Sequence, residues 1–336
     1  MPFTVVCGGF WGDEGKGKVL SYLALQDNPS IVVRAGVGTN AGHTIEFNNR
    51  EYKLRMVPSG FVNPETRMLI GAGVLVNPDV LLRELKVTKT EDRMGVDYQC
   101  GIIEQKHIEI DSTSAHLKGK IGSTGSGTGP ANMDRAMRSL KLARDIPELQ
   151  SYLTDVSLEI NDSLDQGDNV IAEGSQAILL SLFHGSYPFV TSKDTSAAAI
   201  CSDVGVGPTR VDDVMVVMKA FITRVGTGEL PGELSEEETK KRGWTEYGAV
   251  TGRLRRAAPF NYDLAKKAVR LNGATQIALT KLDIVFPEIA KSNNIDNIKG
   301  EVADFIDRIE NTTKVKVTII GTGPAAEDII DMREST

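Results

Sequence analysis

Short apolar segments alternate with longer amphipathic segments along most of the chain, and this alternation restricts the fold more than any other feature. Several of the short segments are almost wholly apolar, as expected for strands that are buried on both faces of a sheet. The expected strands are residues 3–7, 31–34, 67–70, 169–172, 214–221, 276–279 and 315–320. Because strands alternate with helices, the sequence predicts an α/β fold with a central, mostly parallel sheet flanked by helices.

Two of the amphipathic segments show a helical period. Apolar residues recur at spacings of three and four over residues 153–164 and over residues 302–309, which predicts one helix in each range. The repeating residues are Leu153, Val156, Ile160 and Leu164, then Val302, Phe305, Ile306 and Ile309. No internal repeat and no linker rich in Pro, Gly and Ser divides the chain, so we expect a single large domain over residues 1–336.

Composition and charge exclude several classes of protein. The net charge of −7 argues against a general nucleic-acid binder. No apolar run approaches the ~20 residues of a membrane-spanning helix, and the first residues lack the pattern of a signal peptide. Cys7, Cys100 and Cys201 are far apart and odd in number, so they predict neither a metal site nor a disulfide framework. We therefore expect a cytoplasmic protein.

Glycine is in excess, with 33 among 336 residues. Most glycine clusters directly follow an expected strand, and ligands in open α/β sheets bind on the loops at the carboxyl ends of strands. We expect Gly71, Gly73, Gly205 and Gly207 only to turn the chain. The clusters are residues 8–17, 36–42, 71–73, 119–129, 205–207, 226–232 and 321–323.

The first cluster joins the expected strand 3–7 to a helical pattern, which is the context of a phosphate-binding loop. Backbone N–H groups and the positive end of the helix would cradle phosphate oxygens. Gly12 and Gly17-Lys18 match the P-loop spacing, but Val19 replaces the hydroxyl residue that usually holds Mg²⁺. Asp13 lies inside the loop, where its negative charge would be repelled by bound phosphate groups. We therefore expect a functional role for it: to ligate a metal, to accept a proton, or to do both.

A histidine follows the next expected strand. His43 ends a run that contains Gly42 and Asn40, directly after residues 31–34. A lone histidine is more often structural, but this position at a strand end favours a site. Its imidazole would stabilise charge that develops on a phosphoryl group.

The glycine-rich stretch over residues 119–130 also contains Ser123, Thr124, Ser126 and Thr128. Glycine N–H groups together with hydroxyl groups suit a phosphate monoester. A helix is expected to start at residues 134–138, which favours an anchored loop over a flexible linker. Further along, Gln176 and Thr191 are suited to reading a base edge by hydrogen bonds.

Three arginines, Arg253, Arg255 and Arg256, occur within four positions. Guanidinium groups bind carboxylates and phosphates through paired hydrogen bonds. Because the chain is acidic and aromatic residues do not alternate with these arginines, we expect a site for the two carboxylates of a small substrate rather than for nucleic acid.

Residues 280–283, Thr-Lys-Leu-Asp, resemble the Asn-Lys-x-Asp motif of GTP-binding proteins, with Thr in place of Asn. In that motif the carboxylate accepts two hydrogen bonds from guanine, and adenine offers no such pair of donors. Asp283 and Lys281 therefore predict GTP. Residues 321–324 follow the last expected strand and would close the other face of the base.

These motifs occur together, and in the same order, in one family. They are residues 11–18, 40–44, 125–130, 173–176, 187–192, 223–226, 251–256, 280–283 and 322–324. The chain closely resembles the adenylosuccinate synthetases along essentially its whole length. It is similar to their short, archaeal-type branch, because it is much shorter than the bacterial and eukaryotic members.

The resemblance implies a fold like that of the P-loop NTPases and a two-step reaction. GTP phosphorylates O6 of inosine monophosphate (IMP), and the amino group of L-aspartate then displaces phosphate from C6. The products are adenylosuccinate, GDP and phosphate, in the first committed step from IMP to AMP. The resemblance also implies one Mg²⁺ per subunit and a homodimer, in which Arg138 reaches the active site of the partner.

The resemblance further implies a role for individual residues. Asp13 would take the N1 proton of IMP, His43 would act as the acid, and Gln176 would complete the catalytic set. Asp13 and the carbonyl of Gly42 would bind Mg²⁺. The GTP-binding residues would be Gly12, Glu14, Gly15, Lys16, Gly17, Lys18, Gly42, Thr44, Lys281, Asp283, Thr322 and Gly323. The IMP-binding residues would be Asp13, Asn40, Ala41, Gly42, His43, Thr124, Arg138, Gln176, Leu180, Thr191, Val225 and Arg255. The aspartate-binding residues would be Thr251, Gly252, Arg253 and Arg255.

The chain departs from the family at Ser126, where many members have Arg, and at Leu254, which interrupts a longer arginine run. Two other functions compete with the ligase. One is a phage-type enzyme that joins aspartate to dGMP with ATP, and the other is a GTP-binding switch without catalysis. Asp13 and Asp283 favour the ligase over the phage-type enzyme. Asp13, His43 and the arginines favour chemistry over a switch.

Overall fold

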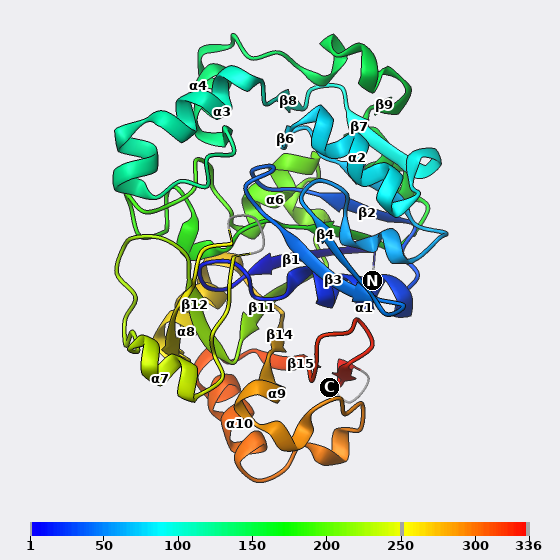
Figure 1. The fold of residues 1–336 in the computed structure, drawn as a ribbon. Coiled ribbons are helices and arrows are strands. Elements are labelled where there is room, and N and C mark those ends of the chain that lie inside the picture. The colour runs from blue at the N-terminus through cyan, green and yellow to red at the C-terminus, as the bar shows by residue number, and fades with distance from the viewer. Residues whose placement is uncertain (1, 249–251, 334–336) are drawn as a thin grey trace.

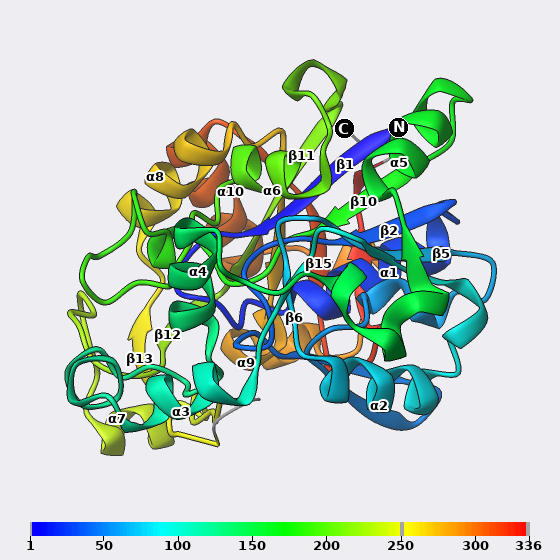
Figure 2. The same cartoon turned by 90° about the horizontal axis from the view of Figure 1, so that it is seen from above.

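The computed structural model describes residues 2–248 and 252–333. Its centre is a ten-stranded sheet with the order β16-β15-β14-β11-β1-β10-β2-β5-β7-β9 (Figures 1 and 2). Every neighbouring pair is parallel except β15 and β16. The strands are β1 (Phe3–Gly8), β2 (Ile31–Arg34), β5 (Arg67–Ile70), β7 (Met94–Asp97), β9 (Leu153–Thr154), β10 (Val170–Glu173), β11 (Asp213–Lys219), β14 (Gln276–Thr280), β15 (Lys316–Gly321) and β16 (Ile329–Asp331).

This architecture confirms the predicted α/β class with a mostly parallel sheet. All of the expected strands lie in the sheet, but the one expected over residues 214–221 is divided. It ends as β11 at Lys219, and the chain then forms β12 (Phe221–Arg224), which pairs with β13 (Arg256–Pro259) outside the main sheet. The sequence analysis missed β7, β9 and β16, which lie at or next to the edges of the sheet.

Helices cover both faces of the sheet, as Figure 2 shows. Side chains of α5, α6, α8 and α10 belong to one apolar cluster with β1, and side chains of α1 belong to another cluster on the opposite face. The helices are α1 (Lys16–Gln26), α2 (Pro78–Thr88), α3 (Gln105–Thr113), α4 (Thr128–Met137), α5 (Val156–Asp165), α6 (Ala197–Val204), α7 (Glu236–Lys241), α8 (Tyr262–Asn272), α9 (Leu282–Val285) and α10 (Glu301–Thr313). No helix in these described ranges is long and apolar enough to span a membrane.

Two helix boundaries differ from the predictions. Leu153 belongs to β9, and α5 starts at Val156, because the Asp155 side chain caps it by accepting a hydrogen bond from the N–H of Leu158. Helix α4 starts at Thr128 and not at residue 134. Pro130 lies in its first turn, where a missing N–H costs nothing, so the glycine-rich stretch runs directly into a helix.

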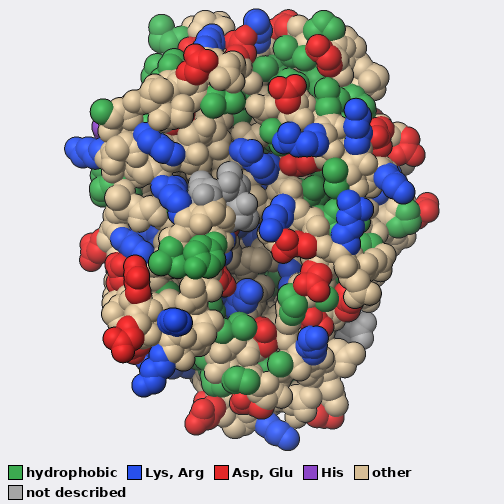
Figure 3. Space-filling model, viewed as in Figure 1, with side chains coloured by type: hydrophobic (Ala, Val, Ile, Leu, Met, Phe, Trp, Pro, Cys, Tyr) green, Lys and Arg blue, Asp and Glu red, His purple; other side chains and the backbone are tan. Residues whose placement is uncertain are grey.

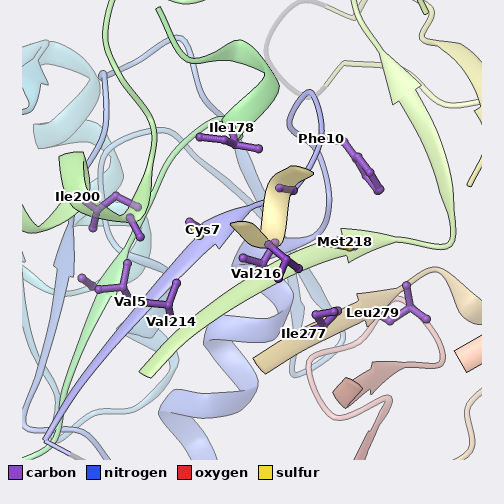
Figure 4. Packing of buried hydrophobic residues seen from close by; sticks show 14 of the residues in the cluster. Val5, Cys7, Phe10, Ile178, Ile200, Val214, Val216, Met218, Ile277 and Leu279 are labelled. Atoms are coloured by element: carbon purple, nitrogen blue, oxygen red, sulfur yellow. The ribbon is translucent and has the colours of Figure 1, made fainter. Parts of the chain in front are cut away.

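The alternating side chains of β1 fix the two faces of the core. Val5 pairs with Ala172 of β10 and with Val214 of β11. Figure 4 shows Val5 beside Val214, with Ile200 of α6 on the same side. Val6 points to the other face and joins the cluster of α1. Because α1 packs directly under β1, the loop between them is held at both ends.

Parallel alignment brings the carboxyl ends of β1, β2, β10, β14 and β15 to one edge of the sheet. The loops that follow these strands contain most of the predicted site residues. A two-stranded hairpin, β3 (His43–Phe47) with β4 (Arg50–Leu54), follows the loop after β2. The topology therefore gathers segments that are far apart in the sequence into one candidate site.

Candidate active site

A cleft of about 980 Å³ opens where these loops meet. Figure 3 shows Lys and Arg side chains around the hollow in this face. Most of the predicted site residues line the cleft. They are Gly12, Asp13, Glu14, Gly15, Lys16, Gly17, Lys18, Asn40, Ala41, Gly42, His43, Thr44, Thr124, Gln176, Leu180, Thr191, Val225, Gly252, Arg253, Arg255, Lys281 and Gly323.

Four predicted residues are not part of this lining. Thr251 lies outside the described residues. Asp283 is partly buried behind the lining, and Arg138 is exposed at the end of α4. Thr322 is fully buried, and its hydroxyl donates to the carbonyl of Ser292 at 2.7 Å. Any contact of Thr322 with a nucleotide would therefore come from its backbone.

Glu14 stabilises the phosphate loop from within. Its Oε1 accepts hydrogen bonds from the backbone N–H groups of Phe10 at 3.1 Å and Gly12 at 2.7 Å. Its Oε2 pairs with Nζ of Lys16 at 2.9 Å. Both side chains are buried, so the pair compensates charge inside the loop. The Glu14 carboxylate is thus occupied by the protein, and we assign it to loop geometry.

Lys18 joins the phosphate loop to the last loop of the sheet. Its Nζ donates to the carbonyl of Gly323 and, at 2.7 Å, to the carbonyl of Asp328. Burial lowers the pKa of Lys18 to about 8, although the carboxylates of Asp328 and Asp283 oppose this shift. The lysine at the P-loop position therefore fixes the segment after β15.

Asp13 lies at one end of a charged network. Its Oδ2 is 2.8 Å from an N–H group of Arg255, and Arg255 is 2.6 Å from Glu246. Nζ of the fully buried Lys219 also meets Glu246, at 2.7 Å. Burial raises the pKa of Asp13, and Arg255 and Lys219 partly oppose that rise. A carboxyl group whose pKa is raised is a better proton acceptor near neutral pH.

Several candidate site residues have a strained backbone. Asp13, Gln176, Lys281 and Arg138 have φ values of 60°, 57°, 58° and 60°. Non-glycine residues rarely adopt this left-handed region, and such strain is concentrated at functional sites. Arg138 is the C-terminal cap of α4, and Lys281 is the N-terminal cap of α9.

A chain of hydrogen bonds connects three predicted IMP residues. The side-chain amide of Gln176 donates to Oδ1 of Asn40 at 3.0 Å. Asn40 in turn donates to the hydroxyl of Thr191 at 3.2 Å. Ser175 fixes the other end, because its hydroxyl donates to Oε1 of Gln176 at 2.6 Å. Loops that follow β2 and β10 are thereby held together on one wall of the cleft.

His43 packs against a fully buried carboxylate. Its Nδ1 contacts Oε1 of Glu173, and the same oxygen accepts hydrogen bonds from Ser59 Oγ at 2.6 Å and from Arg34 at 2.8 Å. Burial and the nearby Arg34 charge lower the pKa of His43 to about 4, against the effect of Glu173. His43 is therefore neutral at pH 7 in the free protein. Burial also opposes ionisation of Glu173, but the adjacent Arg34 charge and the hydrogen bond from Ser59 outweigh it and lower the pKa of Glu173.

The predicted arginine cluster is divided by the structure. Arg253 and Arg255 line the cleft, and Arg253 donates to the carbonyl of Gly122 at 3.0 Å. Arg256 lies in β13, where it donates to the carbonyl of Gly228 at 2.6 and 2.8 Å. Of the three clustered arginines, Arg256 is therefore the one that does not line the cleft.

Asp283 follows β14 next to Lys281. Its Oδ1 is buried and has no hydrogen-bond partner within the described part of the chain. Burial raises the pKa of Asp283, against the attraction of Lys281 and Lys18. Burial of an acceptor without a hydrogen-bond donor raises the free energy of the folded protein. This oxygen is therefore suited to a ligand that supplies N–H groups.

Sequence reasoning missed several residues of this site. Glu246 holds Arg255 and Lys219, while Arg34 and Ser59 hold Glu173. A charged residue at the end of an otherwise apolar strand was the available signal for Arg34 and Lys219. No sequence feature indicated that Glu246, in an irregular loop, would reach them.

Comparisons with known proteins place the chain in one family. The model of the adenylosuccinate synthetase family matches residues 5–148 and 140–291. The adenylosuccinate synthetase of Methanosphaera stadtmanae is 53% identical, over 99% of this chain and 98% of that protein. The adenylosuccinate synthetase of Methanocaldococcus jannaschii is also 53% identical, over 99% of this chain and 97% of that protein.

Two solved structures share the fold. The fully ligated adenylosuccinate synthetase from Plasmodium falciparum has a TM-score of 0.91 and 25% identity, over 98% of this chain and 99% of that chain. A cyanophage S-2L succinoaminodeoxyadenylate synthetase, bound to dGMP and dATP, has a TM-score of 0.81 and 24% identity, over 98% of this chain and 95% of that chain. At that identity, the second likeness concerns the fold alone.

Replacement of Gly17 by Ala tests the packing of the phosphate loop against His43. A Cβ at Gly17 would lie 2.9 Å from Cβ of His43, so the imidazole must move. We expect the turnover of the Gly17→Ala variant to fall by about 100-fold, since small misplacements of a catalytic group have effects of this size. Gly207→Ala is the control, because a Cβ there meets nothing within 4 Å. Equal turnover of the two variants would show that His43 does not need this contact.

Proposed function

The chain belongs to the adenylosuccinate synthetase family, and we propose that it joins L-aspartate to IMP with GTP as co-substrate, forming adenylosuccinate, GDP and phosphate. The main support for this function is that the phosphate loop, Asp13 and the arginines Arg253 and Arg255 all line the same cleft. A GTP-binding switch has no need of a carboxyl group with a raised pKa beside an arginine pair. We treat residues 1–336 as one synthetase domain.

The first step forms a bond between O6 of IMP and the γ-phosphorus of GTP, while the bond from that phosphorus to the β–γ bridging oxygen breaks and GDP leaves. Asp13 is the group that we propose takes the N1 proton, because burial raises its pKa and it lines the cleft. Loss of that proton moves electron density onto O6 and makes it nucleophilic. Lys16 and the N–H groups at the start of α1 would offset the charge of the phosphates, and His43 would hydrogen-bond to the transferred group.

The second step forms a bond between the amino nitrogen of aspartate and C6, and the C6–O6 bond breaks. Phosphate leaves with O6, so a poor leaving group has become a good one. We propose that Arg253 and Arg255 hold the two carboxylates of aspartate, together with Gly252 and Thr251. Arg255 already meets Asp13 and Glu246, so it would orient the amine beside C6.

IMP is proposed to lie along the wall formed by Asn40, Gln176 and Thr191. Their hydrogen-bond chain supports this assignment, because it holds amide and hydroxyl groups in fixed positions around a base. Thr124, on the stretch before α4, would reach the monophosphate. The remaining proposed contacts are Ala41, Gly42, Leu180 and Val225, which line the cleft.

GTP is proposed to bind with its phosphates on residues 12–18 and its base near Asp283. The free Oδ1 of Asp283 suits the N1–H and N2–H₂ groups of guanine. Lys281 and Gly323 line the neighbouring part of the cleft, and Lys18 fixes the loop that contains Gly323. Gly42 and Thr44 would contact the phosphate end.

Asp13 and the carbonyl of Gly42 are the proposed protein ligands of one Mg²⁺. In the described part of the chain, Oδ1 of Asp13 has no ion pair or hydrogen bond, and no cluster of three or more His, Cys, Asp or Glu residues forms a metal site. This donor set fits Mg²⁺, which usually takes one or two carboxylates and completes its shell with phosphate oxygens and water. When bound, the ion would neutralise negative charge on the transferring phosphoryl group.

A homodimer is proposed because Arg138 does not line the cleft of its own chain. Arg138 ends α4 in a left-handed conformation and is exposed. On the same helix Met133 and Met137 are 65% and 75% exposed and lie four residues apart, so they form an apolar strip. A second copy that covers this strip would bring Arg138 to the IMP phosphate of its partner.

We propose a cytoplasmic location. Cys7, Cys100 and Cys201 are free and buried in the structure. Burial raises the pKa values of Cys7 and Cys201 to about 12 and about 11, so neither thiol is reactive at neutral pH. Unpaired cysteines are typical of a reducing compartment.

Turnover with defined substrates tests the function. We expect adenylosuccinate to form from IMP, GTP and aspartate, measured by the absorbance of the product and by phosphate release. An Asp13→Ala variant should bind GTP but give no turnover, because the N1 proton then has no acceptor. Product from dGMP and ATP alone would favour the phage-type reaction, and phosphate release without aspartate would favour the switch.

Nucleotide selectivity tests the role of Asp283. In Asp283→Asn the acceptor pair for guanine is lost, so we expect KM for GTP to rise by about 10- to 100-fold. The same change should favour xanthosine triphosphate relative to GTP, because the amide can donate to the 2-oxo group. Glu288→Gln is the matched control, since Glu288 is exposed in the same region. An unchanged nucleotide preference in Asp283→Asn would refute this base contact.

A further inference from the structure

Arg55 is a positively charged side chain beside the cleft that none of the proposed substrate contacts uses. It directly follows β4 and is half-buried. Within the described ranges its guanidinium group forms no ion pair. The carboxylate of Glu84 attracts this charge, but its oxygens accept hydrogen bonds from the backbone N–H groups of residues 55, 56 and 57 at 2.8, 2.9 and 3.0 Å. A half-buried charge without an ion-pair partner favours an anion nearby.

The guanidinium group of Arg55 joins two segments that contain proposed IMP contacts. Its Nε donates to the carbonyl of Thr39 at 2.7 Å, directly before Asn40 in the loop after β2. Its Nη2 donates to the hydroxyl of Ser126 at 3.3 Å, in the glycine-rich stretch before α4. Thr39 and Ser126 are both buried. Arg55 therefore connects these segments behind the lining of the cleft.

A second hydrogen bond continues from Ser126 to the cleft. Oγ of Ser126 is 2.8 Å from Oγ1 of Thr124, and of the three residues only Thr124 lines the cleft. A guanidinium group is always charged and only donates hydrogen bonds. When an anion in the cleft accepts the hydrogen of Thr124, Oγ1 of Thr124 is left to accept the hydrogen of Ser126. The three donors from Arg55 to Thr124 then all point toward the anion.

We propose that Arg55 is a positioning residue for the monophosphate of IMP: it polarises the hydroxyl of Ser126 and thereby directs the hydroxyl of Thr124 to the phosphate. This inference rests on the proposed function, in which Thr124 reaches the monophosphate. Hydrogen bonds in such a chain strengthen one another, most of all when one end is a cation and the other an anion. The chain has Ser126 where many family members have Arg, and here a guanidinium group reaches the same stretch from the end of β4.

The Michaelis constants of an Arg55→Met variant test this role. Met keeps an unbranched apolar stem but has neither the charge nor the N–H donors. We expect KM for IMP to rise by about 10-fold, because the hydrogen bond to a charged phosphate is weakened. Since the relay ends at the monophosphate, kcat and the KM values for GTP and aspartate should change little.

Arg50→Met is the matched control for this variant. Arg50 begins the same strand, is exposed and is not part of the cleft lining, so all constants should stay as in the wild type. A fall in kcat of Arg55→Met with an unchanged KM for IMP would contradict the proposal. A similar rise of all three KM values would also contradict it, because it would indicate a structural role only.

A double-mutant cycle with Thr124→Val tests whether Arg55 acts through Thr124. Val has about the same size as Thr but lacks the last hydroxyl of the relay. We expect KM for IMP to rise in Thr124→Val, and Arg55→Met to add little to that rise, since residues in one hydrogen-bond chain are not additive. If the two effects multiply, Arg55 acts independently of Thr124 and the relay is refuted.

Binding to the free protein provides a readout that does not depend on turnover. IMP and inosine differ only in the monophosphate, and an NMR titration detects weak ligands as well as tight ones. In Arg55→Met we expect IMP to bind about 10-fold more weakly, while the affinity for inosine stays the same. An equal loss for both ligands would show that Arg55 acts on the base through Thr39 and Asn40, which would contradict the proposal.

Ser126→Ala is a second variant in case Arg55→Met does not fold. It removes the middle hydroxyl of the relay but keeps the hydrogen bond from Arg55 to Thr39. KM for IMP should rise while the other constants stay constant, and an unchanged KM for IMP would count against the proposal.

These experiments separate failure of this proposal from failure of the function. Wild-type protein that makes no adenylosuccinate would contradict the proposed function, and the comparison of IMP with inosine would still decide the role of Arg55. Active wild-type protein with an unchanged KM for IMP in Thr124→Val would contradict both the assigned contact of Thr124 and this proposal.

Discussion

The parallel alignment of β1 with β10 and β11 is the constraint on which the rest of the structure depends. It places the carboxyl ends of strands far apart in sequence at one edge of the sheet. The phosphate loop leaves β1 there, Glu173 ends β10 there, and Lys219 ends β11 there. Both helix layers contribute to this arrangement, since α1 packs under β1 while α6 covers its other face.

Buried charges then convert this edge into a reactive site. Glu246 compensates Lys219 and Arg255, Glu14 compensates Lys16, and Glu173 compensates Arg34. Each pair lies in a place where an isolated ion would be strongly destabilised. Asp283 Oδ1 is left without a hydrogen-bond partner in the described part of the chain, and a guanine would provide the missing donors.

Local patterns predicted the central strands and the phosphate loop, because apolar runs and glycine-rich loops have direct local causes. Local patterns did not predict the features that depend on tertiary contacts. Leu153 fits a helical face by spacing but joins an edge strand, and Arg256 is drawn away from its neighbours by the pairing of β13 with β12. The side chains of two predicted GTP-binding residues, Glu14 and Thr322, make hydrogen bonds within the protein. The contacts of Glu246 could not be predicted from local sequence patterns, because its partners lie in other segments of the chain.

The central claim is that O6 of IMP is phosphorylated in this cleft before aspartate displaces it. Turnover of IMP that is labelled with ¹⁸O at O6 tests it most directly, with the released phosphate analysed by mass spectrometry. If O6 attacks the γ-phosphorus, every phosphate released with adenylosuccinate contains the label. Unlabelled phosphate, formed at the same rate as adenylosuccinate, would contradict the claim, because O6 would then have left without ever being bonded to phosphorus.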